Sequence, residues 1–95
     1  MSDSKTTTVT RKRFEYEEEG HIAYMEFDTD DHGWLTLWHT EVPEALRGRG
    51  IAGILARSAF DHARENSLRV DVICPAAAAF VKKNPEYHNL VGKKS

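Results

Sequence analysis

One short segment carries the residue types of an anion-binding loop. It runs from Arg47 to Ala52, reads RGRGIA, and lies between a strand-like stretch and an amphipathic, helix-like stretch. The first turn of a helix offers backbone N–H groups that have no intrahelical partner. Gly48 and Gly50 lack a Cβ, so a ligand can approach the backbone closely there. Arg47 and Arg49 add positive charge, and the segment therefore predicts a site for a phosphate or pyrophosphate.

Two common nucleotide-binding motifs do not describe this segment. A P-loop would continue with lysine and then serine or threonine, whereas Gly50 is followed by Ile51 and Ala52. The dinucleotide pattern G-x-G-x-x-G is met by residues 48–53, but no acidic residue stands at a clear strand end about 20 residues later. A plain alternative stays open, in which the segment is an arginine- and glycine-rich turn that only caps the helix.

The segment also fits a third pattern, which is Gln or Arg, two residues, Gly, one residue, and then Gly or Ala. It is preceded by a Thr-Glu-Val-Pro run and followed by an alanine-rich helix, a short strand and Cys74-Pro75. In this order, from Phe14 to Val91, the chain resembles the small, single-domain GNAT-like N-acetyltransferases and their coenzyme A pyrophosphate loop. The resemblance implies acetyl-CoA or coenzyme A as the cofactor and an unidentified amine as the acceptor.

The resemblance also implies which residues bind the cofactor. Residues of the strand end would pair with the pantetheine arm, where the strand splays from its neighbour, and the loop amides would bind the pyrophosphate. Two lysines of the second helix could reach the adenosine phosphate, or could be solvated side chains at a helix end. The implied residues are Glu41, Val42, Arg47, Gly48, Arg49, Gly50, Ile51, Ala52, Lys82 and Lys83.

Two further residues are candidates for acetyl-transfer chemistry. Cys74 stands where a strand ends and a proline-initiated helix begins, and a helix N-terminus stabilises a thiolate. Cys74 could accept an acyl group, form a disulfide with the cofactor's thiol, or be a small buried side chain. His39 lies on the strand that leads into the loop, and a neutral imidazole can deprotonate an amine. The alternative for His39 is a strand histidine bonded to a backbone carbonyl.

The usual proton donor of the resembled enzymes has no counterpart in the expected position. Many of them protonate the departing thiolate with a tyrosine on the last helix, where this chain reads Ala76 to Val81, and Tyr87 comes only after an Asn-Pro break. Two functions are therefore considered. The first is an acetyl-CoA-dependent N-acetyltransferase for a small amine or a lysine side chain, with His39 and Cys74 as catalytic residues. The second is a non-catalytic module that binds or senses coenzyme A or acyl-CoA. Besides these two, a structural interaction domain is a weaker option.

Composition narrows the classes of partner. The 95 residues are 40% apolar and 29% charged, which is typical of one soluble domain. The net charge of −2 argues against nucleic acid, and no apolar run approaches the ~18 residues of a membrane span. A single cysteine allows no internal disulfide and favours the cytoplasm. We expect a monomer or weak homodimer and, because residues 30–32 are typical of a turn, no metal site.

The elements that must position these residues predict an α/β fold. We expect a truncated GNAT fold with a mixed, mainly antiparallel sheet of about four strands and two helices. The strands fall at residues 9–16, 21–28, 34–42 and 68–73, and the helices at 51–65 and 75–83, so the last two strands run parallel. Strict alternation in the third strand would place His39 with Leu35 and Leu37, and Thr40 on the opposite face. Residues 1–8 are expected to form a flexible tail and residues 9–95 the single domain.

Overall fold

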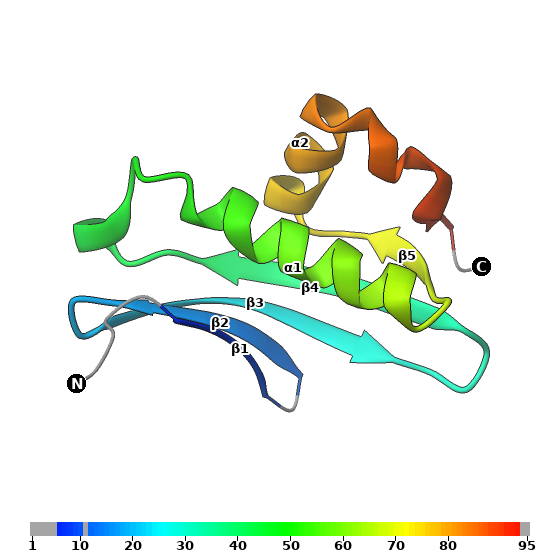
Figure 1. Cartoon of the computed structure of the whole chain (residues 1–95), viewed down its shortest axis with the longest axis horizontal. Coiled ribbons are helices and arrows are strands. Elements are labelled where there is room, and N and C mark those ends of the chain that lie inside the picture. Colours follow the sequence, from blue (N-terminus) through cyan, green and yellow to red (C-terminus); the bar gives the residue numbers. More distant parts are fainter. Residues whose placement is uncertain (1–5, 11, 94–95) are drawn as a thin grey trace.

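The computed structural model describes the backbone of residues 6–10 and all of residues 12–93, and in these ranges the strands form one sheet (Figure 1). The strands, in chain order and in their order across the sheet, are β1 (Thr6–Thr10), β2 (Arg13–Glu18), β3 (His21–Thr29), β4 (Trp34–Glu41), β5 (Arg69–Val72) and β6 (Val91–Gly92). Strands β1 to β4 pair antiparallel, whereas β5 and β6 join in parallel. The helices are α1 (Ile51–Glu65) and α2 (Pro75–Lys83), with the short 3-10 helices η1 (Glu44–Leu46) and η2 (Pro85–Leu90).

The α/β class, the mixed sheet, both helices and the parallel pairing after α1 are confirmed. The expected number of about four strands is too low, since the described residues form six. The expected strand at residues 9–16 is divided between β1 and β2 by a turn in which Lys12 has a φ of 68°. Strand β6 adds a short edge near the C-terminus. Strand β1 begins at Thr6, within the segment expected to be a tail, and residues 1–5 lie outside the described ones.

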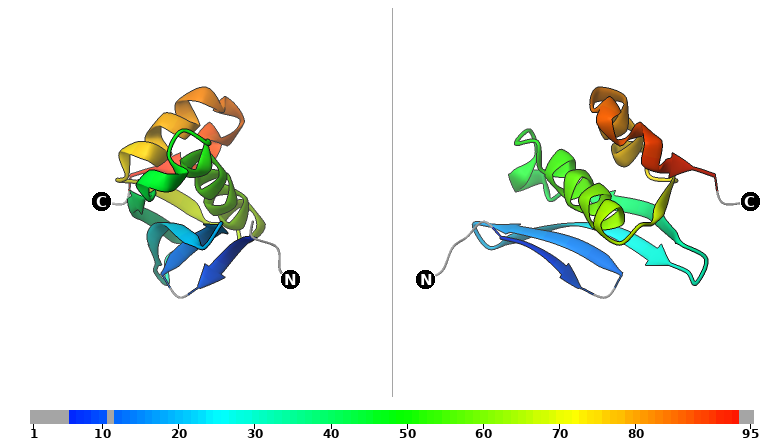
Figure 2. Two further views of the ribbon diagram at one scale, coloured as in Figure 1. Left: turned by 90° about the vertical axis from the view of Figure 1, so that its left-hand side faces the viewer. Right: turned by 45° about the vertical axis from the view of Figure 1, so that its right-hand side comes forward.

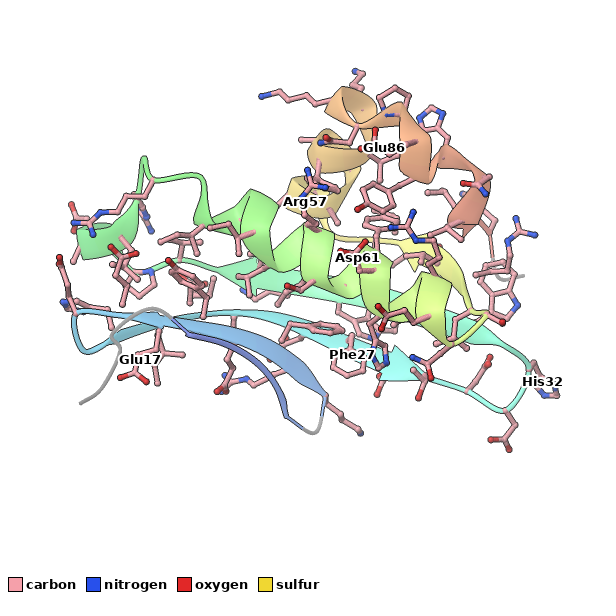
Figure 3. The ribbon with its side chains drawn as sticks, viewed as in Figure 1. Glu17, Phe27, His32, Arg57, Asp61 and Glu86 are labelled. Carbon is pink, nitrogen blue, oxygen red and sulfur yellow. The ribbon has the colours of Figure 1, made fainter. Side chains whose placement is uncertain are left out.

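The core lies between one face of the sheet and helix α1. Apolar residues recur every fourth position along α1, and Ile51, Leu55, Ala59 and Ala63 are all buried. They pack against buried side chains of β2 and β3, and Phe27 lies between the sheet and α1 (Figure 3). Both helices lie on this side of the sheet, as two further views show (Figure 2). The loop before α1 and the start of α2 therefore lie on the same side of the sheet.

An irregularity in β4 changes the expected orientation of its second half. Phe27 of β3 pairs with Leu37 and Glu26 pairs with His39, so Trp38 is an extra residue on β4. Beyond it the alternation is reversed. Thr40 pairs with the buried Met25 and faces the helices, whereas His39, opposite Glu26, is exposed on the far side. The predicted placement of His39 beside Leu35 and Leu37 is therefore wrong, because one inserted residue exchanges the two faces.

Candidate functional site

The loop before α1 presents free backbone donors. Gly48 and Gly50 have φ values of 82° and 73°, a conformation that glycine adopts without strain. Gly50 is the N-cap of α1 and accepts the bond from Ile54 N–H at 3.2 Å. In the described part of the chain, no turn or cap hydrogen bond uses the amides of residues 48–53 as donors. Since a Cβ at either glycine would meet nothing within 4 Å, the space beside these amides is open.

The guanidinium groups of the loop have protein partners. Arg47 Nε donates to the carbonyl of Val42 at 3.1 Å. Arg49 Nη1 donates at 2.7 Å to Glu18 Oε2, and Glu18 is 7% exposed and also accepts from the hydroxyl of Tyr16 at 3.0 Å. The hydrogen bond to Glu18 raises the pKa of Arg49, and burial, followed by the bond to Glu18, raises the pKa of Tyr16. The side chain of Arg49 thus ties the loop to strand β2.

An open groove of about 300 Å³ extends from the loop between α1 and α2. Its lining is mostly small side chains, together with the ring of Phe80 and two polar residues from the end of α2. The lining residues are Gly50, Ala52, Gly53, Ala76, Ala79, Phe80, Lys83 and Asn84. Of the two lysines predicted from the sequence, Lys83 therefore lies beside the loop, whereas Lys82 lines a different hollow together with His88.

A second hollow of about 450 Å³ continues this groove along α1, because the two share Gly50, Gly53, Phe80 and Asn84. It adds Arg57, whose Nη1 donates to the Tyr87 hydroxyl at 3.3 Å. Sequence reasoning missed both Asn84 and Arg57 as groove residues. A signal for Arg57 was present, since it follows Gly50 and Gly53 on one face of α1 at helical spacing.

Strands β4 and β5 separate directly beside this groove. Their parallel pairing ends at Leu37 and Val72, and the amides of Ile73 and Cys74 both donate to the carbonyl of Leu37, at 3.0 and 2.9 Å. Helix α2 then turns away at Pro75. Within the described residues no strand pairs with the β5-facing side of residues 38–41. The expected divergence of the strands is present, and Glu41 and Val42 lie at its open end.

Cys74 lies at this divergence and is buried, with 1% of its surface exposed. Its Sγ lies 2.9 Å from the hydroxyl oxygen of Thr40, so the two side chains form a hydrogen-bonded pair across the opening between the strands. Cys74 is also the N-cap of α2, and its carbonyl accepts from Ala78 N–H at 3.1 Å. Thr40 is a polar group that alternation had placed on the opposite face.

His39 lies on the face opposite Cys74. Its Nε2 is 3.1 Å from Glu41 Oε1, and both side chains are about half exposed. The ring of Tyr24 meets it edge-on, at 6.4 Å between centroids. The structure therefore brings the loop, Lys83, Thr40 and Cys74 to the helix side of the sheet, and leaves His39 on the other side of the same opening.

Tyr87 is not placed as a proton donor for the opening. It is 2% exposed, packs on Phe60 and donates its hydroxyl to Asp61 Oδ1 at 2.7 Å. Burial, followed by that hydrogen bond, raises the pKa of Tyr87. The tyrosine therefore holds η2 against α1.

Comparison with known proteins fits this geometry. The family model of GCN5-related N-acetyl-transferases matches residues 13–90, which is most of the chain and includes the loop, the groove and the opening. The chain belongs to the GCN5-related N-acetyltransferase family. The mixed sheet and the two helices expected from the sequence are both present, and both helices lie over one face of that sheet.

The individual curated relatives match a shorter part of the chain than the family model does. The protein NATD1 of Bos taurus is 55% identical over 51 residues, which are 54% of this chain and 45% of that protein. The human NATD1 protein is 49% identical over a segment of the same length. The chain thus spans about half the length of the curated relatives that it matches. The solution structure of a GCN5-like N-acetyltransferase candidate from Staphylococcus aureus matches with a TM-score of 0.75, covering 99% of this chain and 94% of the other. At 22% identity that match concerns the fold alone.

The described residues contain neither a candidate metal site nor a candidate membrane-spanning helix. No group of three or more His, Cys, Asp or Glu side chains there is arranged to hold a metal ion. None of the helices in residues 12–93 combines the length and the apolar character that crossing a membrane requires.

Proposed function

We propose that this domain binds acetyl-CoA in the groove between α1 and α2 and transfers its acetyl group to an amine. The observation that carries the proposal is the row of unused amides at residues 48–53, at the N-terminus of α1, with open space beside Gly48 and Gly50. Amides in this arrangement suit a pyrophosphate. The mostly apolar lining of the groove, together with Lys83, suits the rest of a nucleotide-like ligand. Bound there, acetyl-CoA would supply an acetyl group as an activated thioester.

The residues of the chain then have separate tasks. The amides of residues 48–53 hold the pyrophosphate, and the unpaired edge at Glu41 and Val42 directs the pantetheine arm toward the opening between β4 and β5. Lys83 is the better placed of the two lysines for the adenosine end. Arg49 contributes its amide and fixes the loop, because its guanidinium is bonded to Glu18.

His39 and Cys74 act from the two sides of the opening. An amine must lose a proton to attack the thioester carbon, and His39, oriented by Glu41, takes that proton. As the new C–N bond forms, the C–S bond breaks, and the thiolate of coenzyme A needs a proton. The thiol of Cys74 can supply it, and the Cys74 thiolate that remains can take a new proton from solvent by way of the adjacent Thr40 hydroxyl. An acyl-cysteine intermediate is the alternative, and it requires the buried thiol of Cys74 to become exposed.

A non-catalytic module that binds or senses acyl-CoA is the second candidate. The observation that favours it is the burial of Cys74, since a thiol that is 1% exposed is guarded from solution thiols and thioesters. Both candidates use the same loop and groove. We also propose a cytoplasmic location, from the single free cysteine, and a monomer or weak homodimer.

The test has two steps. Calorimetric titration with acetyl-CoA should show binding, and a thiol-release assay with a panel of primary amines and lysine peptides should show amine-dependent release of coenzyme A. His39→Gln and Cys74→Ala should lower kcat more than they raise KM. Binding without amine-dependent release would leave the sensing module as the function. No heat of binding at millimolar acetyl-CoA would refute both.

A further inference from the structure

The face of the sheet that is turned away from the helices is here called the open face. Both described helices and the two 3-10 segments lie on the opposite side (Figures 1 and 2). Cross-strand pairing identifies the side chains of the open face, since directly paired residues point the same way. Its carboxylates are Glu15, Glu17, Glu26, Asp28, Glu41 and Asp71.

Among residues 12–93, cations are fewer than carboxylates on the open face, and each has a local contact. Arg13 lies 3.8 Å above the ring of Tyr24, Lys12 is 3.6 Å from Asp28, and Arg69 lies 5.6 Å from the ring of Trp34. The described side chains of this face therefore carry more carboxylates than cations, and together they give a negative field. Such a field attracts a polycation, and it repels nucleic acids and anionic membranes.

The open face also carries exposed apolar side chains. Ile22, which pairs with Glu17, and Trp38, which is bonded to Asp28, lie on it and are 47% and 49% exposed. Ile73 is 52% exposed and directly follows β5, where the alternation of Arg69 and Asp71 puts it on the same face. The Trp38 indole is held in place by its bond to Asp28, 3.0 Å from Nε1 to Oδ2. Exposed aromatic and aliphatic groups among charges are typical of a protein–protein contact. A bare polyamine would leave them uncovered, whereas a peptide would bury them.

The open face borders the opening between β4 and β5. Trp38 and His39 follow Leu37, where the strands separate, and Ile73 directly precedes Cys74. A side chain that enters the opening from this face approaches Cys74 from the side opposite the groove. A basic segment docked here would therefore have its lysines next to His39.

From these observations we infer that the open face docks a basic, lysine-containing polypeptide segment. One of its lysines is the acetyl acceptor. This acceptor role rests on the proposed function, whereas the docking itself does not. The carboxylates provide orientation and a fast, salt-sensitive encounter, and the exposed Ile22, Trp38 and Ile73 provide the apolar contact.

The inference is tested by peptide binding in the absence of coenzyme A. The probe is a short, terminally blocked peptide of lysine, leucine and glycine, titrated into the whole chain, with a glutamate-for-lysine peptide and spermidine as further ligands. One double variant, Glu17→Gln with Glu26→Gln, removes two carboxylates from the open face. The matched control, Glu65→Gln with Glu86→Gln, removes two from the helix side; Figure 3 shows Glu17 and Glu86 on opposite sides of the molecule.

The lysine peptide should bind, more weakly at high salt, and the open-face variant should raise its Kd by about two- to thirtyfold, the range for two exposed ion pairs. The control should leave the Kd unchanged. Equal binding of the glutamate peptide, equal losses in both double variants, or spermidine binding as tightly as the peptide would overturn the inference. The peptide titration contains no coenzyme A, so it tests the docking face independently of a separate titration with coenzyme A. If the peptide binds and coenzyme A does not, the proposed function is refuted and the docking face stands. If coenzyme A binds and the peptide does not, the docking face is refuted and the proposed function stands.

Discussion

Replacing Gly50 with alanine separates the cost of backbone strain from the loss of a ligand contact. Gly50 has a φ of 73°, and a Cβ there would meet nothing within 4 Å. In the folded protein the only cost is therefore that of holding alanine in left-handed backbone, about 1–2 kcal/mol. Alanine also reduces the freedom of the unfolded chain, which offsets roughly 0.4–1 kcal/mol of that cost. We expect the free energy of unfolding to fall by about 1 kcal/mol, and the Tm by roughly 4–8 °C.

The effect on binding should be larger than the effect on stability. The new methyl group would stand in the groove, between a pyrophosphate and the amides of residues 48–53. Loss of one charge-assisted hydrogen bond costs about 1.5–3 kcal/mol, so Gly50→Ala should raise the Kd for coenzyme A by about ten- to a hundredfold. The assays are thermal unfolding and calorimetric titration.

Gly33→Ala is the matched control. Gly33 has a φ of 86° and equally open surroundings, but lies in the turn between β3 and β4, away from the groove. Both variants should lose similar stability, and only Gly50→Ala should lose affinity. Equal affinities for coenzyme A in the two variants would refute the assignment of the loop as the pyrophosphate site.

Three further predictions follow from the same contacts. Cys74→Ala should leave the Kd for coenzyme A within about twofold while abolishing any covalent coenzyme A or acetyl adduct seen by intact-mass spectrometry; a large loss of affinity would place Cys74 in the binding site instead. Glu18→Gln should weaken coenzyme A binding, because it loosens Arg49, whereas Glu17→Gln on the other face should not; tighter binding in Glu18→Gln would show that Glu18 competes with phosphate for Arg49. Because burial raises the pKa of Tyr87, the folded state holds that proton more tightly than the unfolded state, so stability is complete below the ordinary value of 10.0 and falls as the pH rises above it. Tyr87→Phe should flatten that fall in urea unfolding measured against pH, and an unchanged slope would contradict the role of Tyr87.

The sequence predicted the parts of the fold that depend on local pattern. Helix α1 follows from an uninterrupted apolar period, and α2 begins at Pro75 because proline suits the first helical position. The parallel pairing of β5 with β4 follows from the helix that joins them. The loop was recognisable because its positions with positive φ are occupied by glycines, which the sequence shows directly.

The errors in the sequence-based prediction concern features that arise from pairing between strands. The extra residue Trp38 leaves no mark in a regular alternation, yet it moves Thr40 to the side of Cys74 and His39 to the other. The hydrogen bond between Arg49 and Glu18 joins residues far apart in sequence. The sequence alone therefore predicted that the Arg49 side chain only adds positive charge to the loop. The short β6 has too few residues to show a period.

The central claim is that the amides at the start of α1 bind the pyrophosphate of coenzyme A. The most direct measurement is an NMR titration that follows each backbone amide of the isotope-labelled chain as coenzyme A is added. The account predicts the largest shifts, saturating together, at residues 48–53, with smaller shifts at Lys83 and Asn84 in the groove. Absence of saturable shifts at residues 48–53 at millimolar coenzyme A, or shifts confined to the open face, would contradict it.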